Sequence, residues 1–184
     1  MVGAPDKASF TGKVYVFALA SGTWAETQSI TGSDSDFGNK FGYALAIDRG
    51  LALVGAPTAA VGGFSAIGAV YSFAVANGIL SETQKISSND GQANDGFGSS
   101  VALFGTKAIV GAPEKMVGAN SQQGKAYLFR QAGGNWKQTG ALLASDGTTG
   151  SFFGWAVDLD RTTDLVGDVT YPTPAAYFYM RPAL

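Results

Sequence analysis

The chain repeats itself with a period of 56 residues. A Phe-Gly pair opens three copies of one unit, and its phenylalanines, Phe41, Phe97 and Phe153, are each 56 residues apart. The segment Val-Gly-Ala-Pro at 54–57 recurs at 110–113 with the same spacing. A fixed period of this length is typical of an array of supersecondary units, in which each unit buries its apolar face against the next.

The period divides the chain, residues 1–184, into one module of four consecutive units. The two central units, 41–96 and 97–152, are complete, whereas the flanking units, 1–40 and 153–184, are partial. Because the first residues already lie in the middle of a unit, we expect the chain to be an excised, processed or truncated piece of a longer product.

Each complete unit contains four short stretches with strand character, separated by turn signals such as Asn77-Gly78. Four antiparallel strands per unit are typical of a β-propeller blade. We therefore predict an all-β fold of about three and a half propeller blades, with three, four, four and three strands in succession. In the second unit the predicted strands are 41–47, 51–56, 69–75 and 80–86.

Large apolar residues recur at equivalent positions of the outer strands. The third strand of the second unit carries Tyr71 and Phe73 on one face, and we expect both to pack between neighbouring blades. The fourth strand carries Trp24, Leu80 or Trp136 at its equivalent position. Packing is the favoured role there too, and an exposed stacking residue is the alternative.

Composition excludes several classes of function. Only 14% of the residues are charged and the net charge is −2, which predicts no nucleic-acid binding and no basic patch for anionic membranes. Apolar runs are too short for membrane insertion as a helix. The chain has no cysteine and no histidine, which excludes Ser-His-Asp and Cys-His catalysis and histidine-based zinc sites within it. We expect no enzyme activity.

Strand alternation places the loops after strands two and four on the same side of each blade, and rigid scaffolds present binding residues on such loops. Loops 58–67 and 114–123 are the longest, and the loops after strand four carry three aspartates in register. Turn capping is the favoured role for the aspartates and ligand contact is the alternative. The candidate binding residues are Asp34, Asp90, Asp146, Phe64, Ser65, Asn120 and Gln122.

The runs "FGYALAIDRGLALVGAP" and "FGSSVALFGTKAIVGAP" closely resemble the FG-GAP repeat, as do "GKVYVF", "GAVYSF" and "GKAYLF". The linker "LLASDGTTGSFFG" is similar to those of secreted bacterial members. The resemblance implies a β-propeller like that of integrin α subunits, located outside the cell or on its surface, that binds proteins or other ligands. Fold analogy alone does not establish a function.

Many integrin-like members carry a calcium loop, and here the sequence departs from that pattern. The turns of the complete units are too short and too poor in carboxylates for calcium. In the last unit Asp158, Asp160 and Asp164 fit the third, fifth and ninth loop positions, but Ala156 occupies the first and Arg161 replaces the glycine. A solvated acidic turn is the favoured interpretation, calcium at this turn is the alternative, and no other cofactor is expected.

Three functions remain open. The leading interpretation is a non-catalytic extracellular propeller module for protein or ligand binding, adhesion or assembly. A lectin with one carbohydrate site per blade would pair the repeated aspartates with Trp24 and Trp136. A non-catalytic part of a larger secreted enzyme is the third. Expected partners are a protein or glycan ligand, together with the rest of a longer chain or a second copy that completes the propeller. Two copies would supply the 28 strands of a seven-bladed ring.

Overall fold

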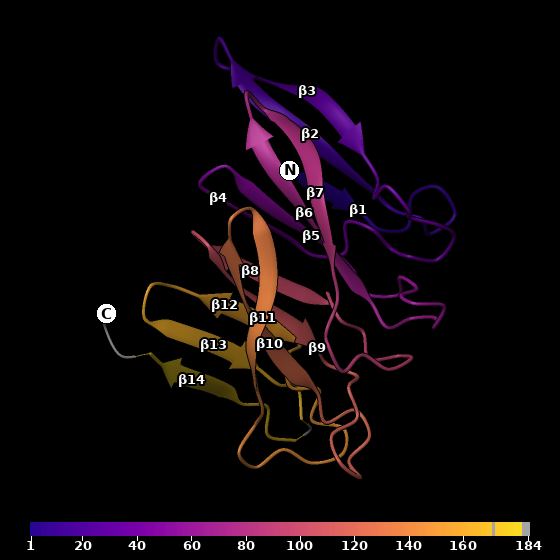
Figure 1. The fold of residues 1–184 in the computed structure, drawn as a ribbon, viewed down its shortest axis with the longest axis vertical. Helices are drawn as coiled ribbons and strands as arrows, with labels where there is room; N and C mark the ends of the chain where they lie inside the picture. The colour runs from indigo at the N-terminus through magenta and orange to yellow at the C-terminus, as the bar shows by residue number, and fades with distance from the viewer. Residues whose placement is uncertain (171, 182–184) are drawn as a thin grey trace.

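The computed structural model describes residues 1–170 and 172–181, and every helix or strand it assigns within these ranges is a β-strand. The strands form four antiparallel sheets that follow one another along the chain (Figure 1). Strand orders are β1-β2-β3, β4-β5-β6-β7, β8-β9-β10-β11 and β12-β13-β14. The predicted all-β fold of propeller-type blades, with three, four, four and three strands, is confirmed.

In each sheet, successive strands of the chain are also neighbours in space. The first sheet contains β1 (Val2–Ala4), β2 (Lys13–Ala20) and β3 (Thr23–Ile30). The second contains β4 (Leu45–Asp48), β5 (Leu51–Ala56), β6 (Ala69–Ala76) and β7 (Ile79–Ile86). The third contains β8 (Ser100–Phe104), β9 (Lys107–Ala112), β10 (Lys125–Ala132) and β11 (Asn135–Leu142). The fourth contains β12 (Ala156–Leu159), β13 (Thr163–Gly167) and β14 (Ala176–Met180).

The Phe-Gly pair lies before the first strand of its sheet and not within it, so the predicted strand 41–47 is too long at its start. Gly42 has a φ of 91°, which is outside the extended region, and β4 begins only at Leu45. Phe41 instead forms a parallel bridge to Gly12 of the preceding sheet, and its N–H donates to the carbonyl of Thr11 at 3.0 Å. The motif therefore joins two sheets.

Glycine is required in both halves of the repeated motif because neighbouring backbones touch there. A Cβ on Gly55 would lie 2.1 Å from the carbonyl oxygen of Gly98, just before the first strand of the next sheet, closer than atoms can approach. The same clash, at 2.0 Å, would occur between Gly3 and Gly42 and between Gly111 and Gly154. The period in the sequence thus reflects a backbone contact that is repeated at every junction between sheets.

Buried aromatic side chains fill the junctions, as predicted for Tyr71 and Phe73. The ring of Phe41 makes edge-to-face contacts with Tyr71 and Phe73, at centroid distances of 5.3 and 6.2 Å. These rings pack against Val14 and Val16 of the first sheet. Because a single sheet leaves one face of these side chains open, each blade needs its neighbour to complete the core.

The large apolar residue of the fourth strand packs against the preceding sheet. Leu80 lies in the cluster between the first and second sheets, and Trp136 in that between the second and third. The indole Nε1 of Trp136 donates to Oγ of Ser72 at 2.9 Å. Trp24, at the equivalent position of the first sheet, is 67% exposed, whereas Trp136 is 3% exposed. Packing is therefore confirmed for Leu80 and Trp136 but not for Trp24.

A β-bulge lets the fourth strand contact both neighbouring sheets. In the second sheet Ser72 pairs with Gln84 and Phe73 with Glu82, which leaves Thr83 as the extra residue. An extra residue interrupts the alternation of side chains along a strand. Glu82 accepts bonds from the N–H and Oγ of Ser33, in the linker after the first sheet. Gln84 bonds to the third sheet instead. Register shifts at equivalent positions occur in β2–β3 and β10–β11.

Two glutamine side chains each form two hydrogen bonds with the backbone of the next sheet, and we call this contact the glutamine clasp. The amide of Gln84 accepts a bond from the N–H of Trp136 at 2.7 Å and donates to its carbonyl at 3.1 Å. Gln28 does the same to Leu80, at 2.8 and 3.0 Å. The equivalent position of the third sheet is Gly140, which has no side chain to form a clasp.

The first and fourth sheets, which have three strands each, do not fit together as the shared blade that a seven-bladed ring of two copies would need. Both contain the second and third strands of a blade, so they cannot merge into one four-stranded blade. Two copies would therefore contribute eight sheets rather than seven complete blades, although the number of strands is that of a seven-bladed ring.

Replacing Gly55 by alanine should destabilise the protein by about 2 kcal/mol or more, because the new methyl group would overlap the carbonyl of Gly98. The control is Gly140→Ala, where the nearest atom to the new Cβ is 3.8 Å away. Urea unfolding followed by tryptophan fluorescence measures both. Equal stabilities of the two variants would contradict the steric explanation of the repeat.

Replacing Gln84 by alanine should lower the free energy of unfolding by about 1–3 kcal/mol, because the backbone groups of the largely buried Trp136 lose their partners. Gln131→Ala is the matched control, since its amide makes one exposed bond of 3.4 Å within its own sheet. Thermal unfolding of both variants tests this. A loss no greater than that of the control would show that the clasp contributes nothing.

Candidate binding site

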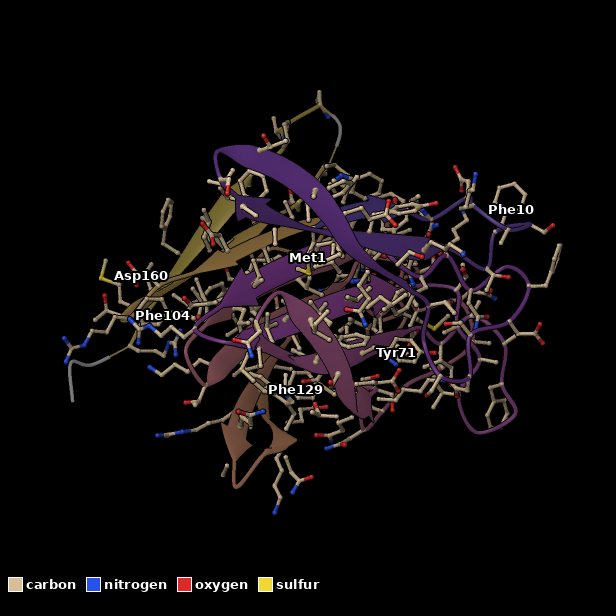
Figure 2. All side chains as sticks on the ribbon, turned by 90° about the horizontal axis from the view of Figure 1, so that it is seen from above. Met1, Phe10, Tyr71, Phe104, Phe129 and Asp160 are labelled. Carbon is tan, nitrogen blue, oxygen red and sulfur yellow. The ribbon has the colours of Figure 1, made fainter. Side chains whose placement is uncertain are left out.

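The long loops of the first three sheets and the linkers between successive sheets lie at one end of the molecule, which we call the loop face. Figure 2 shows Phe10 at this end and Phe104 and Asp160 at the opposite end, where the tight hairpins lie. Backbone bonds join neighbouring loops: the N–H of Lys40 donates to the carbonyl of Phe10 at 2.8 Å. The loop face comprises residues 5–12, 31–44, 57–68, 87–99, 113–124 and 143–155.

Each of the three repeated aspartates accepts a hydrogen bond from the tyrosine of a third strand. Asp34 Oδ1 accepts from the hydroxyl of Tyr71 at 2.7 Å, and its other oxygen accepts from Nζ of Lys85 at 2.7 Å. The equivalent tyrosine bonds have the same length at the next two aspartates. The pairs are Tyr127 with Asp90 and Tyr177 with Asp146.

The bond between Asp34 and Tyr71 shifts the pKa of both side chains. Burial alone would raise the pKa of Asp34, but hydrogen bonds from Lys85 and Tyr71 outweigh it and hold the pKa below its ordinary value. Burial and the hydrogen bond to Asp34 raise the pKa of Tyr71 well above its ordinary value. The pKa of Asp90 is lowered by equivalent bonds from Lys125 and Tyr127, so the Asp34 and Asp90 carboxylates are ionised at neutral pH although about half of each side chain is exposed.

The two longest loops each form a small hairpin of their own. Val61 pairs with Phe64, and Val117 pairs with Asn120 at the equivalent place. Phe64 and Ser65 are exposed at the tip, and Asn120 Nδ2 donates to Oε1 of the buried Gln123 at 2.9 Å. The candidate residues of these loops therefore differ in role, because Asn120 helps to hold the loop and the first two face solvent.

Gln122 is exposed beside a shallow hollow on the loop face. The hollow has a volume of about 220 Å³, and its lining includes Met116, Asn94 and Gln122. It lies between the loops of two successive units. Of the sequence candidates, Phe64, Ser65 and Gln122 are exposed, as the three aspartates are, but the aspartate carboxylates are already bonded to tyrosines.

A buried ion pair that the sequence did not indicate fixes two of the loops together. Nζ of Lys115 lies 2.8 Å from Oδ2 of Asp95, and both side chains are about 95% buried or more. The same carboxylate oxygen accepts the N–H of Gln92 at 2.6 Å. Neither residue recurs with the period, so no signal in the sequence marked the pair.

Several large apolar side chains on the loop face are exposed, and sequence reasoning did not select most of them. Phe64 was a candidate, and it is 65% exposed. A search for large apolar residues within predicted loops would have found Phe10, Phe37 and Met116, whereas Tyr43 lies in the predicted strand 41–47 and Trp155 follows the equivalent Phe-Gly pair. The other exposed residues are Phe10, Phe37, Tyr43, Met116, Leu143 and Trp155.

The three carboxylates of the hypothetical calcium turn do not converge. Asp160 accepts the N–H groups of Thr162 and Thr163, both at 2.7 Å, and so caps the turn. Asp164 is buried and paired with Arg181, and Asp158 projects from β12. The described residues contain no cluster of three or more acidic side chains placed to hold a metal ion. The structure thus gives no support to calcium at this turn.

Of the two tryptophans that a lectin-type site would pair with the repeated aspartates, Trp136 is not available to a sugar, whereas Trp24 is exposed. Trp136 is buried on an outer strand and bonded to Ser72, so its ring offers no face to a sugar. The repeated aspartates are bonded to tyrosines instead. Within the described part of the chain, no helix is long and apolar enough to cross a membrane.

Converting Asp34 and Asp90 to asparagine should weaken the dependence of stability on pH. Their folded-state pKa values are lowered, so the stability they add is present above the ordinary aspartate pKa of about 4 and is lost as the pH falls further. We expect the melting temperature of the parent chain to exceed that of the double variant at pH 7, with the gap closing towards pH 3. Asp6→Asn, on an exposed loop residue, is the control and should keep a constant offset. A gap that widens in acid would refute this.

Comparison with known proteins agrees with the geometry. The FG-GAP repeat family matches residues 24–73, 80–129 and 136–178, which is most of the chain. Integrin alpha-2 from Mus musculus is 30% identical over 184 residues, an alignment that covers 91% of this chain. The chain spans only 15% of that relative. Three matched repeats, together with sheets joined at the Phe-Gly and Gly-Ala-Pro motifs, identify the chain as a member of the FG-GAP repeat family.

Proposed function

We propose that the chain is a non-catalytic binding module that acts outside the cell or on its surface, and that its loop face contacts a protein ligand. The four sheets act together as one module. FG-GAP repeats of the integrin type support an extracellular binding or adhesion role in general terms. The nature of the ligand is inferred from the surface of the loop face.

The observation that carries the proposal is the exposure of several large apolar side chains on the loop face. Phe37, Phe64 and Met116 are each more than half exposed, and they come from three different loops. Isolated exposed apolar residues are common, but several large ones carried on one face by neighbouring loops favour an interaction surface. Aromatic residues and methionine are also enriched where proteins bind one another.

The rigidity of the loops supports the same conclusion. The buried pair of Lys115 and Asp95 and the tyrosine bonds to Asp34 and Asp90 hold the loops in place before any ligand arrives. A preformed surface loses less conformational entropy on binding. Ser65 and Gln122, which are exposed beside the apolar residues, would supply hydrogen bonds at the rim.

The proposal predicts which side chains matter for binding. The immobilised chain should bind at least one member of a panel of purified extracellular-matrix and cell-surface proteins. The double variant Phe64→Ser/Met116→Ser should weaken that binding by about tenfold or more, since truncated central contacts typically cost over 1 kcal/mol each. Surface plasmon resonance measures the affinities.

The matched control is Phe178→Ser, which removes an equally exposed aromatic ring from β14, away from the loop face. It should bind like the parent chain. A glycan array run with the same variants tests the carbohydrate alternative. Binding to glycans alone, or protein binding that is indifferent to the loop variants, would refute the proposal.

A further inference from the structure

Several segments of the loop face meet around a small polar pocket between the second and third sheets. Its volume is about 140 Å³, and its lining includes the charged side chains of Lys40 and Glu114. Asn94 and Tyr43 add an amide and a phenol to the same lining. The function proposed above does not use this pocket.

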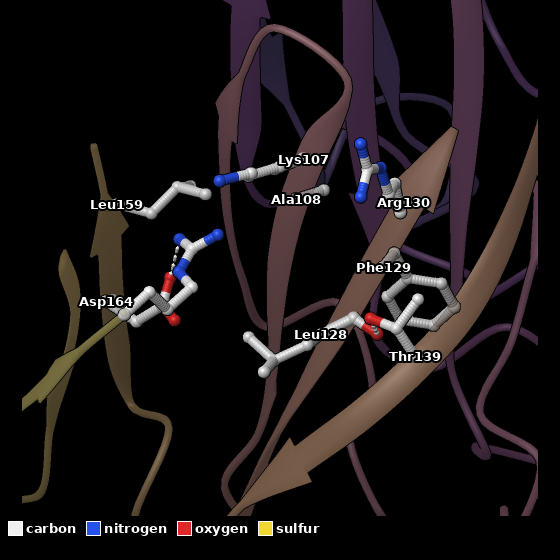
Figure 3. Close-up of a pocket in the computed structure, with 9 residues that line it drawn as sticks. Lys107, Ala108, Leu128, Phe129, Arg130, Thr139, Leu159 and Asp164 are labelled. Atoms are coloured by element: carbon white, nitrogen blue, oxygen red, sulfur yellow. Dashed lines mark hydrogen bonds and ion pairs between the residues drawn. The ribbon is translucent and has the colours of Figure 1, made fainter. Parts of the chain in front are cut away.

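The residues around this pocket lie well inside the part of the chain that the structure describes. The hollow of about 320 Å³ drawn in Figure 3, between the third and fourth sheets, is different. Arg181, one of the residues that line it, is the last that the structure describes. The walls of that hollow are therefore known only in part, and no site is inferred there.

The two charges of the polar pocket are not neutralised by neighbouring side chains. Other lysines close to the loop face are paired, for example Lys85 with Asp34 and Lys125 with Asp90. Among the described residues, by contrast, Nζ of Lys40 and the carboxylate of Glu114 form no ion pair or hydrogen bond, either with each other or with a third group. The pocket thus presents one cation and one anion that only solvent satisfies.

The pocket is specific to this junction between sheets, because its polar side chains break the 56-residue period. The equivalent positions in the other units carry no charge and no amide. They are Gly96 and Phe152 for Lys40, Gly38 and Gly150 for Asn94, and Thr58 and Thr170 for Glu114. A scaffold contact would be needed at every junction, so the change of residue type at this one favours a local role in binding.

The buried ion pair of the loop face fixes one wall of the pocket. Asp95 and Lys115, which pair at 2.8 Å, directly follow Asn94 and Glu114 in the chain. Nζ of Lys115 also donates to the carbonyl of Asp90, so both loops are anchored below the surface. Because the backbone is already held in place, Asn94 and Glu114 lose less conformational entropy when a ligand arrives.

Size and charge together define the chemistry of a ligand for this pocket. A volume of about 140 Å³ is that of about five water molecules at roughly 30 Å³ each, so only a very small molecule fits. A molecule with an ammonium group and a carboxylate pairs with both Glu114 and Lys40. Because water screens each exposed ion pair, a ligand that makes both pairs has a clear advantage over one that makes a single pair.

We propose that the pocket binds a small zwitterion, namely an amino acid with little or no side chain. The ammonium group of the ligand pairs with Glu114 and its carboxylate pairs with Lys40. Asn94 and Tyr43, which line the same pocket, supply further hydrogen bonds.

Glycine, β-alanine and γ-aminobutyrate are suitable probes, because they differ in the distance between their two charges. At least one of them should bind the full chain with a Kd below about 10 mM, read from amide chemical-shift changes at Lys40, Asn94 and Glu114. Acetate and methylammonium each carry one of the two charges and should bind at least about tenfold more weakly.

Two charge-removing variants test the assigned roles. Glu114→Gln and Lys40→Gln should each weaken binding of the zwitterion at least about fivefold. Glu114→Gln should also bind the zwitterion no better than acetate, and Lys40→Gln no better than methylammonium. The matched controls are Glu26→Gln and Lys7→Gln, which remove the same charges from exposed residues outside the pocket and should leave the affinity unchanged.

Three results would overturn the proposal. The first is the absence of shift changes in the pocket with every zwitterion at concentrations up to about 100 mM. The second is an affinity for acetate or methylammonium equal to that for the best zwitterion, or an equal loss in the control variants. The third is tighter binding of a neutral sugar such as glucose at the same amides, because the two charges would then not select the ligand.

Discussion

The architecture depends on a contact between two backbones. Where Gly55 of one sheet meets the carbonyl of Gly98 in the next, there is no room for a side chain. This approach sets the separation and angle of adjacent sheets, and the position of every aromatic ring between them follows. Phe41 can bridge to Gly12 and still reach Tyr71 only because the glycines let the chains come so close. The Phe-Gly and Gly-Ala-Pro motifs therefore mark the contact between neighbouring blades and not the interior of one blade.

Polar contacts then decide how the joint is held at its two ends. At the loop face, tyrosines of the third strands bond to the aspartates of the linkers, and the buried pair of Lys115 and Asp95 adds a further tie. Along the outer strands, the glutamine clasp and the hydrogen bond from Trp136 to Ser72 also hold neighbouring sheets together. Both ends are thereby fixed, which leaves the exposed tips of the loops free to differ between units.

Periodicity in the sequence predicted what all units share. The strands, their number per sheet and the packing of Tyr71 and Phe73 all follow from residues that recur with constant spacing. It could not predict the start of β4, because the left-handed backbone of Gly42 is set by the neighbouring sheet. Nor could it indicate that Asp34 bonds to Tyr71, since a sequence does not state how the linker after the first sheet lies against the second sheet. The exposure of Phe37 and Met116 was missed for the opposite reason, because neither belongs to the repeated pattern.

The glutamine clasp has a consequence for how such arrays evolve. Gln28 grips the peptide groups of a leucine, and Gln84 grips those of a tryptophan, with the same geometry. The glutamine amide bonds only to the main-chain N–H and C=O groups, so the contact does not depend on which side chain the partner residue carries. Units can therefore be duplicated, exchanged or reordered without losing this attachment, whereas the bond between Trp136 and Ser72 survives only if both residues are inherited together. The glutamine clasp therefore tolerates a change of neighbouring unit, whereas the bond between Trp136 and Ser72 requires one particular pair of neighbouring units.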